Sequence, residues 1–342
     1  METDVLMREA SELLAQKGLI LQEVSSERHY WFIRTQGGSY FEEFFLDGFV
    51  AIGHEDVDCV AEDDRTEAII EKVKKTHPQA TRVLNQVYKF CNEIHCGDIV
   101  IIPSASSAQF AFGYIEDNEV YTVEVSDEDI DDGKCPYKRR RKTHWVQGIP
   151  KARVDSKLYT FFRNQQAISN VDDYSEYIER ALHPLYMKNG LAHLTLTLLP
   201  SESPYALDIP IYMQGILKGA SELANELGLS KDITKAQSRT NVQSAGLIEL
   251  FGNPFFILLI AVIVIGLFGG TVVYRKNGEN FECEMGTGGL IDAILKIWDK
   301  VFEHEQYLNE VQEAQSRLEI QDPRDREKLP IGFRPNRNDE DL

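Results

Sequence analysis

Five consecutive cations form the densest group of side chains in the sequence that could do chemistry. They are Lys138, Arg139, Arg140, Arg141 and Lys142. Adjacent lysines and arginines can neutralise several phosphates of a nucleic-acid backbone. Because the whole chain carries a formal net charge of −19, its summed field repels nucleic acid, and any such contact has to be local. We predict that this block binds a phosphate backbone. The alternative is a solvated loop that balances the acidic residues at 124–132.

The cysteine and histidine pattern predicts neither a metal site nor catalysis. Cys91, His95 and Cys96 have C-x4-C spacing without a second pair, which is not a zinc signature. The sequence has no G-x-S-x-G, no phosphate-binding G-x-x-x-x-G-K-[ST] and no H-E-x-x-H. We therefore expect no metal, no cofactor and no enzymatic activity. The odd number of cysteines, five, lacks the spacing of a disulfide scaffold and indicates a reducing compartment.

Short β-branched and aromatic runs must position these residues in the first half of the chain. The runs cover 30–35, 49–52, 98–102, 110–115, 120–125 and 144–147. They are separated by Gly, Asp and Asn, as is typical of a small mixed sheet or barrel. Between them, 66–75 and 80–94 show helical periodicity, with Val83, Val87 and Phe90 on one face. The pattern predicts a β-rich domain with a helical insert.

The order of four pieces resembles a known family. The pieces are YWFIRT at 30–35, GFVAIGHEDV at 48–57, CGDIVIIPSASSAQFAFGYI at 96–115 and THWVQGIP at 143–150. Together they resemble the PUA-like (EVE/YTH-related) domain found at the N-terminus of many Mrr-type restriction endonucleases and related prokaryotic defence proteins. The resemblance covers about residues 28–185. It implies a β-barrel with a pocket that receives one base, often a modified base flipped out of DNA or RNA.

The resemblance also implies a set of ligand-binding residues. They are Trp31, Arg34, His54, Ser104 and Trp145. The family usually has Trp after the AIG turn, whereas this chain has His54, a smaller ring that can donate or accept a hydrogen bond. The alternative for the two tryptophans is a place in the core, and Arg34 could pair with a carboxylate instead of a ligand.

The segment 255–274 (FFILLIAVIVIGLFGGTVVY) has twenty residues without a charge. Twenty helical residues span about 30 Å, the thickness of a bilayer's hydrocarbon core. We therefore predict one transmembrane helix. The alternative is a buried element of a soluble core or an oligomer interface. The N-terminus lacks the apolar run of a signal peptide, so we expect a single-pass protein of the inner (plasma) membrane with a cytoplasmic N-terminal domain.

The predicted fold class is α+β, with a PUA-like barrel and helical insert, a small α/β stalk, one transmembrane helix and a C-terminal amphipathic helix. The expected boundaries are 1–24 for an N-terminal helix, 25–188 for the sensor domain, 189–252 for a β-α-β stalk, 253–275 for the transmembrane helix, 276–320 for a hairpin and amphipathic helix, and 321–342 for a flexible tail.

A membrane segment stands where Mrr-type enzymes carry their nuclease. We therefore predict a membrane-anchored sensor and effector of a prokaryotic antiphage defence system. It would bind modified DNA or RNA, or a nucleotide signal, and would act on the membrane as a homo-oligomer. The first alternative is a non-toxic membrane-tethered adaptor that holds a protein or RNA partner. The second is a soluble subunit of a complex, in which 255–274 is a core element.

Overall fold

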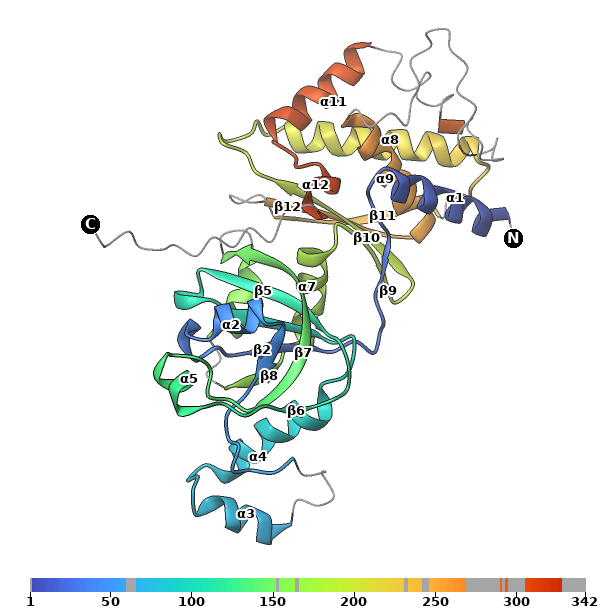
Figure 1. Cartoon of the computed structure of the whole chain (residues 1–342). Helices are drawn as coiled ribbons and strands as arrows, with labels where there is room; N and C mark the ends of the chain where they lie inside the picture. Colours follow the sequence, from blue (N-terminus) through green and yellow to red (C-terminus); the bar gives the residue numbers. More distant parts are fainter. Residues whose placement is uncertain are drawn as a thin grey trace, which may run out of the picture. The chain divides into compact units, whose positions relative to one another are not determined.

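The computed structural model of the chain describes residues 2–59, 66–151, 154–163, 166–230, 233–241, 246–268, 290, 293–294 and 305–327. The described residues divide into two compact units (Figure 1). One unit comprises residues 27–182, and the other combines residues from 1–26 with residues from 183–328.

The unit of residues 27–182 is built on a mixed sheet that curves into a half-barrel (Figure 1). Its strands, in spatial order, are β3 (Phe49–Ala51), β7 (Arg139–Pro150), β5 (Gln109–Ile115), β4 (Ile99–Pro103), β2 (Tyr30–Ile33) and β8 (Ile168–Asn170), and β6 (Tyr121–Thr122) also pairs with β7. The β2–β4 pair is parallel, and the other neighbours are antiparallel.

Both faces of this sheet are covered, which explains why all four residues of β2 are buried. Side chains alternate across a strand. Trp31 and Ile33 therefore enter one hydrophobic cluster, whereas Tyr30 and Phe32 enter another. The sequence of a strand that is buried on both faces is a continuous apolar run, without the alternation of apolar and polar residues that a half-exposed strand shows.

Along the sequence, the helices of this unit lie between its strands and after the last strand. They are α2 (Phe41–Leu46), α3 (Glu67–Lys74), α4 (Ala80–Tyr88), α5 (Asp127–Asp131), α6 (Tyr159–Phe162) and α7 (Ser175–Leu182), with a π-helix η3 (Lys89–Glu93) and 3-10 turns η1 (Gln36–Gly38), η4 (Ala105–Ser107), η6 (Ser156–Leu158) and η7 (Asp172–Tyr174). Helix α4 places Val83 and Val87 in the core of the half-barrel. The continuation of α4 as a π-helix places Phe90 there as well.

The second unit is a sheet with helices packed against it. The strands, in spatial order, are β1 (Gln22–Glu23), β9 (Leu185–Lys188), β10 (Leu191–Leu198), β12 (Gly246–Gly252) and β11 (Ala236–Asn241). The helices are α1 (Glu2–Gln16), α8 (Asp208–Glu226), α9 (Pro254–Leu267), α11 (Glu305–Arg317) and α12 (Pro323–Glu327). Residues 189–252 were expected to form a separate stalk, and their strands β10, β11 and β12 share one sheet with β9 and β1 and one core with α1.

The expected transmembrane helix at 253–275 is wrong. Helix α9 has 14 residues, about 21 Å at 1.5 Å per residue, against about 30 Å for a bilayer core. It packs against α8, α1 and β10, and all its residues except Pro254 and Gly266 are buried. No helix in the described ranges combines the length and the apolar character that a membrane crossing requires. A helix that is apolar all round is buried either in lipid or in protein, and here protein covers it.

The start of α9 has ordinary causes in the sequence. Asn253 caps the first turn, because its Oδ1 accepts hydrogen bonds from the N–H groups of Phe255 and Phe256 at 3.0 and 3.3 Å. Pro254 stands at the first helical position, where its missing N–H costs little.

Several expectations lie outside the described residues. They are the hairpin at 271–285, most of the amphipathic helix at 290–308 and the part of the tail from 328 onward. Within the expected tail, α12 is helical, and Arg324 pairs with Asp322.

Candidate functional site

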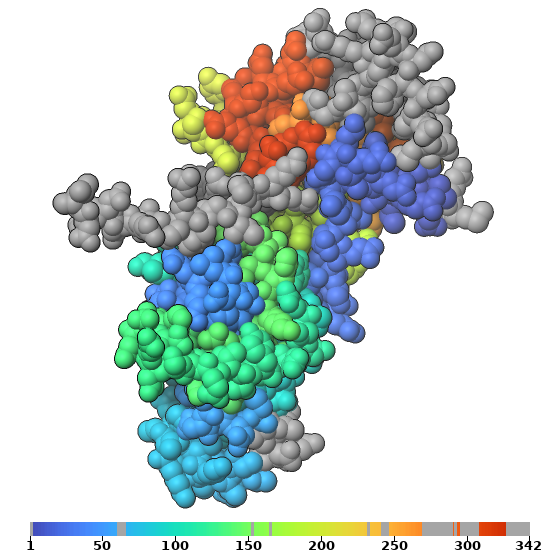
Figure 2. All heavy atoms as spheres, viewed as in Figure 1, coloured from blue at the N-terminus to red at the C-terminus, as the bar shows by residue number. Residues whose placement is uncertain are grey.

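A cavity of about 790 Å³ lies in the unit of residues 27–182, beside the start of α4. We call it the α4 cavity. It is lined by Arg34, Gln36, Gly37, Ala51, Ile52, Gly53, His54, Glu55, Gln79, Arg82, Val83, Gln86, Tyr137, Arg163 and Ala167. Three of the segments that contribute, coloured blue, light blue and green, meet on the face shown in Figure 2. Its volume falls within the range of about 300–1,000 Å³ that is usual for small-molecule sites.

The backbone around the α4 cavity adopts conformations that side chains disfavour. Gln36 has φ 52° and His54 has φ 73°, both in the left-handed region. Such residues cost of order 1–3 kcal/mol each and gather at ligand-binding and catalytic sites. Gly53, next to His54, leaves room for the ring of Tyr137, which would lie 3.1 Å from an added Cβ. The two strained residues and the close ring make the cavity a candidate functional site.

His54 presents a neutral ring to the α4 cavity. Burial lowers its pKa below the ordinary value, and the nearby His77 lowers it further. The two imidazole rings meet edge to face at 5.1 Å between centroids, and Nε2 of His77 lies 2.9 Å from Oδ2 of Asp56. A neutral imidazole offers one donor and one acceptor. His54 can therefore form hydrogen bonds with the edge of a planar heterocycle.

Cationic side chains dominate the lining. Arg34, Arg82 and Arg163 line the α4 cavity, and Glu55 is the acidic residue among the lining residues. Nη2 of Arg34 donates to the carbonyl of Phe162 at 3.1 Å, which holds this guanidinium at the wall. Nη1 of Arg82 donates to Oε1 of Gln79 at 3.2 Å. In a chain with net charge −19, this local excess of positive charge favours an anionic ligand.

Amide and phenol groups complete the α4 cavity. Oε1 of Gln86 accepts the N–H of Ala167 at 3.2 Å, and its Nε2 makes no hydrogen bond to any residue that the structure describes. The hydroxyl of Tyr137 donates to Oε1 of Gln36 at 3.4 Å. Burial raises the pKa of Tyr137, so the phenol keeps its proton. These groups can pair with the polar edge of a base.

The structure brings two of the five residues implied by the resemblance to the α4 cavity, Arg34 and His54. Trp31 is 1% exposed, and its Nε1 donates to Oδ2 of Asp98 at 2.9 Å. Trp145 donates to the carbonyl of Phe44 at 2.7 Å. Both tryptophans belong to the hydrophobic cluster of the half-barrel.

Trp145 and Ser104, two of the other implied residues, make contacts within the half-barrel. The ring of Trp145 lies against Gly113, where an added Cβ would be 2.7 Å from it. Oγ of Ser104 accepts the N–H of Gln109 at 3.0 Å and thereby closes the turn between β4 and β5. Neither Trp145 nor Ser104 is among the residues that line the α4 cavity.

The basic block occupies the start of β7, and each of its cations has a partner within the chain. Arg141 is 1% exposed and donates from Nε and Nη2 to the carbonyls of Phe90 and Cys91 at 2.7 and 2.9 Å. Arg139 donates to the carbonyl of Val57 at 2.6 Å. The other partners are Glu124 for Lys138, Glu43 and the Phe49 ring for Arg140, and Asp117 for Lys142. None of the five lines the α4 cavity.

The cysteines differ from the expectation of reduced thiols. Cys59 and Cys91 form a disulfide across a sequence separation of 32 residues. Cys96 and Cys135 are free, and Sγ of Cys96 donates to the carbonyl of Glu116 at 3.0 Å. Sequence spacing could not reveal this pair, because the fold brings the two Cα atoms to 5.9 Å. In the described ranges, no group of His, Cys, Asp and Glu has the arrangement of a metal site.

Sequence reasoning missed several residues of the α4 cavity. Gln79, Arg82 and Gln86 recur at intervals of three and four, which places them on one side of a helix. That polar stripe beside the apolar face of 80–94 was a usable signal. Tyr137 and Arg163 had no such signal, because only the tertiary structure brings them to α4.

A model of a family described as a domain of unknown function (DUF8426) matches residues 31–170. No curated protein and no solved structure matches the chain. The matched residues lie within the unit of residues 27–182 and include every residue that lines the α4 cavity, from Arg34 to Ala167. The chain is therefore similar, over its half-barrel, to a family described without a function.

Proposed function

We propose that residues 27–182 form a sensor that binds a nucleotide in the α4 cavity, either free or as a base turned out of a nucleic-acid strand. The observation that carries this proposal is the concentration of Arg34, Arg82 and Arg163 around one cavity in a strongly acidic chain. Arginine binds phosphate through charge and through paired N–H donors. A ligand that combines a phosphate with a planar polar ring fits this lining.

The remaining groups suit the base of such a ligand. The rings of Tyr137 and His54 offer faces on which a base can stack, as aromatic side chains do in proteins that bind unpaired bases. The Nε2 donor of Gln86 and the neutral imidazole of His54 offer hydrogen bonds to the base edge. The resemblance of residues 28–185 to the PUA-like domain supports the same ligand class, although the cavity residues only partly coincide with the implied ones.

The membrane effector role predicted from the sequence depended on a helix that crosses a membrane. With that helix corrected, we propose ligand binding alone. We also leave the phosphate-binding role of residues 138–142 out of the proposal, because their cations contact carbonyls, carboxylates and a ring within the chain.

Titration calorimetry on the full chain tests the proposal. The probes are AMP, GMP, CMP and UMP, together with a short single-stranded DNA and RNA of mixed sequence. We expect binding of at least one probe, weakened about tenfold by Arg82→Ala and by Arg163→Ala, since a hydrogen bond to a charged group contributes about 1.5–3 kcal/mol. Arg8→Ala is the matched control, because Arg8 is an exposed arginine of α1 that pairs with Glu12 and does not line the α4 cavity.

The two probe classes distinguish the source of the nucleotide. Tighter binding of an oligonucleotide, falling as salt rises, indicates a nucleic acid, because each neutralised phosphate releases counterions. Binding of a monophosphate without a gain from the longer strand indicates a free nucleotide. The proposal fails if no probe binds, or if the double variant Arg82→Ala/Arg163→Ala binds as well as Arg8→Ala does.

A further inference from the structure

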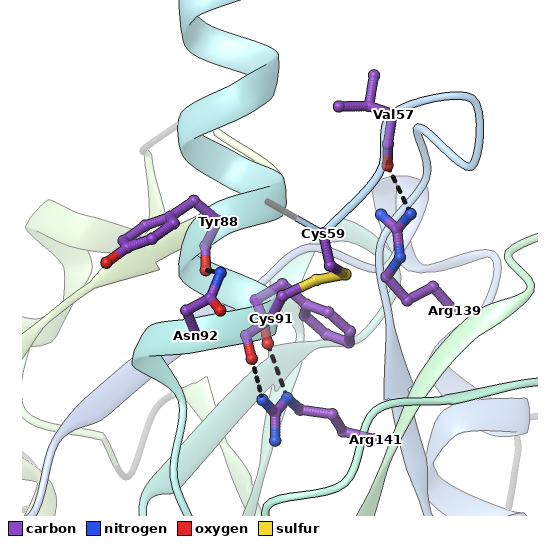
Figure 3. Close-up of a disulfide and its surroundings, with 8 residues drawn as sticks. Val57, Cys59, Tyr88, Cys91, Asn92, Arg139 and Arg141 are labelled. Carbon is purple, nitrogen blue, oxygen red and sulfur yellow. Dashed lines mark hydrogen bonds between the residues drawn. A yellow bond between two sulfur atoms is a disulfide. The ribbon is translucent and has the colours of Figure 1, made fainter. Parts of the chain in front are cut away.

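The disulfide between Cys59 and Cys91 connects the segment after β3 to the helical segment of α4 and η3, and both segments contribute residues to the lining of the α4 cavity or adjoin it. Cys59 lies in the connection between β3 and α3, which also carries Gly53, His54 and Glu55. Cys91 lies in the π-helix that continues α4, the helix that carries Arg82 and Gln86 (Figure 3). One covalent bond therefore fixes the separation between the wall with His54 and the wall with Arg82.

The other contacts that hold the loop to its surroundings are weaker or lie on one side of it. The Asp56–His77 pair is exposed, with the Asp56 side chain 50% accessible, and exposed pairs contribute little. Val57 is buried and accepts a hydrogen bond from Arg139, which ties the loop to β7. The disulfide is the covalent connection between the loop and the α4 side.

The disulfide lies at the surface on its Cys59 side, where an external thiol can approach. Cys59 is exposed and Cys91 is half-buried. Thiol exchange requires access and a thiolate, and neighbouring cations favour the thiolate. Arg139 and Arg141 approach this region from β7 (Figure 3), and each has a buried Nη1 without a hydrogen-bond partner in the described part of the chain. By contrast, burial raises the pKa of the Cys135 thiol to about 12, so that thiol stays protonated.

The half-barrel does not depend on this cross-link for its core. Val83, Val87 and Phe90 pack α4 and its π-helix into the hydrophobic cluster from inside. Structural disulfides are characteristic of small domains that lack a sufficient core. A cross-link at the accessible edge of a well-filled core can therefore break without unfolding the unit.

We propose that Cys59 and Cys91 form a reversible redox modification site that holds the two walls of the α4 cavity together and thereby raises its affinity for a nucleotide. The effect on affinity rests on the proposed function. In reduction, a thiolate of an external dithiol attacks Sγ of Cys59, and the Cys91 thiolate leaves and is protonated. The second thiol of the dithiol then displaces Cys59, so that the dithiol becomes a disulfide and the protein gains two electrons and two protons.

Hydrogen peroxide reverses the reaction with balanced atoms. The Cys59 thiolate attacks one peroxide oxygen, the O–O bond breaks, and a sulfenic acid and hydroxide form. The Cys91 thiolate then attacks the Cys59 sulfur and displaces the second hydroxide, which restores the S–S bond. The two hydroxides take up the two protons that the thiols released, and the products are the disulfide and two molecules of water.

Alkylation and hydrogen exchange on the full chain test the site without any ligand. After treatment with dithiothreitol, we expect iodoacetamide to label Cys59 and Cys91, and peroxide to restore their protection. Reduction should also accelerate amide exchange at residues 53–59 and 66–78. Cys59→Ser and Cys91→Ser should show the faster exchange without reductant, whereas Cys96→Ser, which removes an exposed free thiol, should respond to dithiothreitol as the unaltered chain does.

The same samples then report the affinity for the monophosphate that binds best. We expect reduction to weaken binding about tenfold. This is the loss of affinity expected if only about a tenth of the reduced molecules hold the cavity in its binding conformation. Cysteines that resist alkylation after dithiothreitol, or exchange that does not change on reduction, would overturn the redox site. If no nucleotide binds in either state, the proposed function fails, and exchange at 53–59 still decides whether the disulfide fixes the wall.

Discussion

His54 combines a left-handed backbone with a half-buried, neutral ring at the α4 cavity. The ring replaces the tryptophan that the PUA-like resemblance implies, and only a side chain that tolerates φ 73° can stand there without a large cost. Histidine is several-fold enriched in this region among non-glycine residues. The residue thus supplies hydrogen-bonding atoms at a position where the backbone disfavours a side chain.

Two substitutions of His54 separate the backbone cost from the function of the ring. We expect His54→Gly to have a free energy of unfolding about 1 kcal/mol higher than His54→Ala, because alanine must hold the left-handed conformation that glycine adopts freely. Both variants lack the ring and should weaken nucleotide binding equally. Chemical denaturation and calorimetry measure the two quantities.

Lys75 provides the matched control for this pair. Its φ is −66° at the end of α3, so Lys75→Ala should be more stable than Lys75→Gly by up to about 1 kcal/mol, the usual order. The same order at position 54 would contradict the assigned backbone strain.

At the scale of elements, α9 and β7 show that a run of chemically similar residues does not determine what the run packs against. The apolar run of α9 is covered by α1, α8 and β10, and its Ile263 packs 3.2–3.4 Å from where a Cβ on Gly219 would lie. The basic run at the start of β7 alternates across its strand, so that Arg141 is buried whereas Lys142 is exposed. In both elements, packing partners remote in the sequence decide the role.

Truncation of α9 tests its place in the core. Leu259 is 0% exposed, and we expect Leu259→Ala to lower the free energy of unfolding by about 3 kcal/mol, the middle of the range for buried leucines. Leu207→Ala, at a position 66% exposed in the same unit, should change it by less than about 0.5 kcal/mol. Denaturation followed by circular dichroism gives both values, and equal effects would show that α9 is not a core helix.

At the scale of the whole molecule, the chain begins in one unit, forms the unit of residues 27–182 and then returns to the first unit. Ala10, Leu14 and Leu19 from the N-terminal segment lie in the same hydrophobic cluster as residues of α8 and α9. Among the residues that the structure describes, the two clusters of the half-barrel draw their members from the range between Tyr30 and Leu182. Each unit therefore has its own hydrophobic core, although the unit that combines residues from 1–26 and from 183–328 is discontinuous in sequence.

This division predicts that residues 27–182 fold without the remainder of the chain. Their cores need no residue from outside this range, so we expect a single cooperative thermal transition and the same nucleotide affinity as the full chain. A shorter fragment, 27–150, lacks β8, α6 and α7 and with them much of the second cluster. It should show no cooperative transition, and a folded 27–150 beside an unfolded 27–182 would refute the boundary.

The local pattern of the sequence determined much of the half-barrel. Apolar β-branched runs predicted strands where β2, β3, β4 and β5 lie, and the period of 80–94 predicted α4 with its buried valines. These features follow from neighbours a few residues apart, which the sequence displays directly. The polar stripe with Arg82 and Gln86 was visible for the same reason.

The tertiary structure alone decided what surrounds each of these elements. It placed Tyr137 and Arg163 opposite α4, brought Cys59 to Cys91, and covered α9 with protein. An apolar run fits lipid or a protein core equally well, and a cation fits a phosphate or a carbonyl equally well. The sequence by itself therefore determined which residues require burial and which require a partner for their charge. Contacts between distant segments determined which partners these residues have.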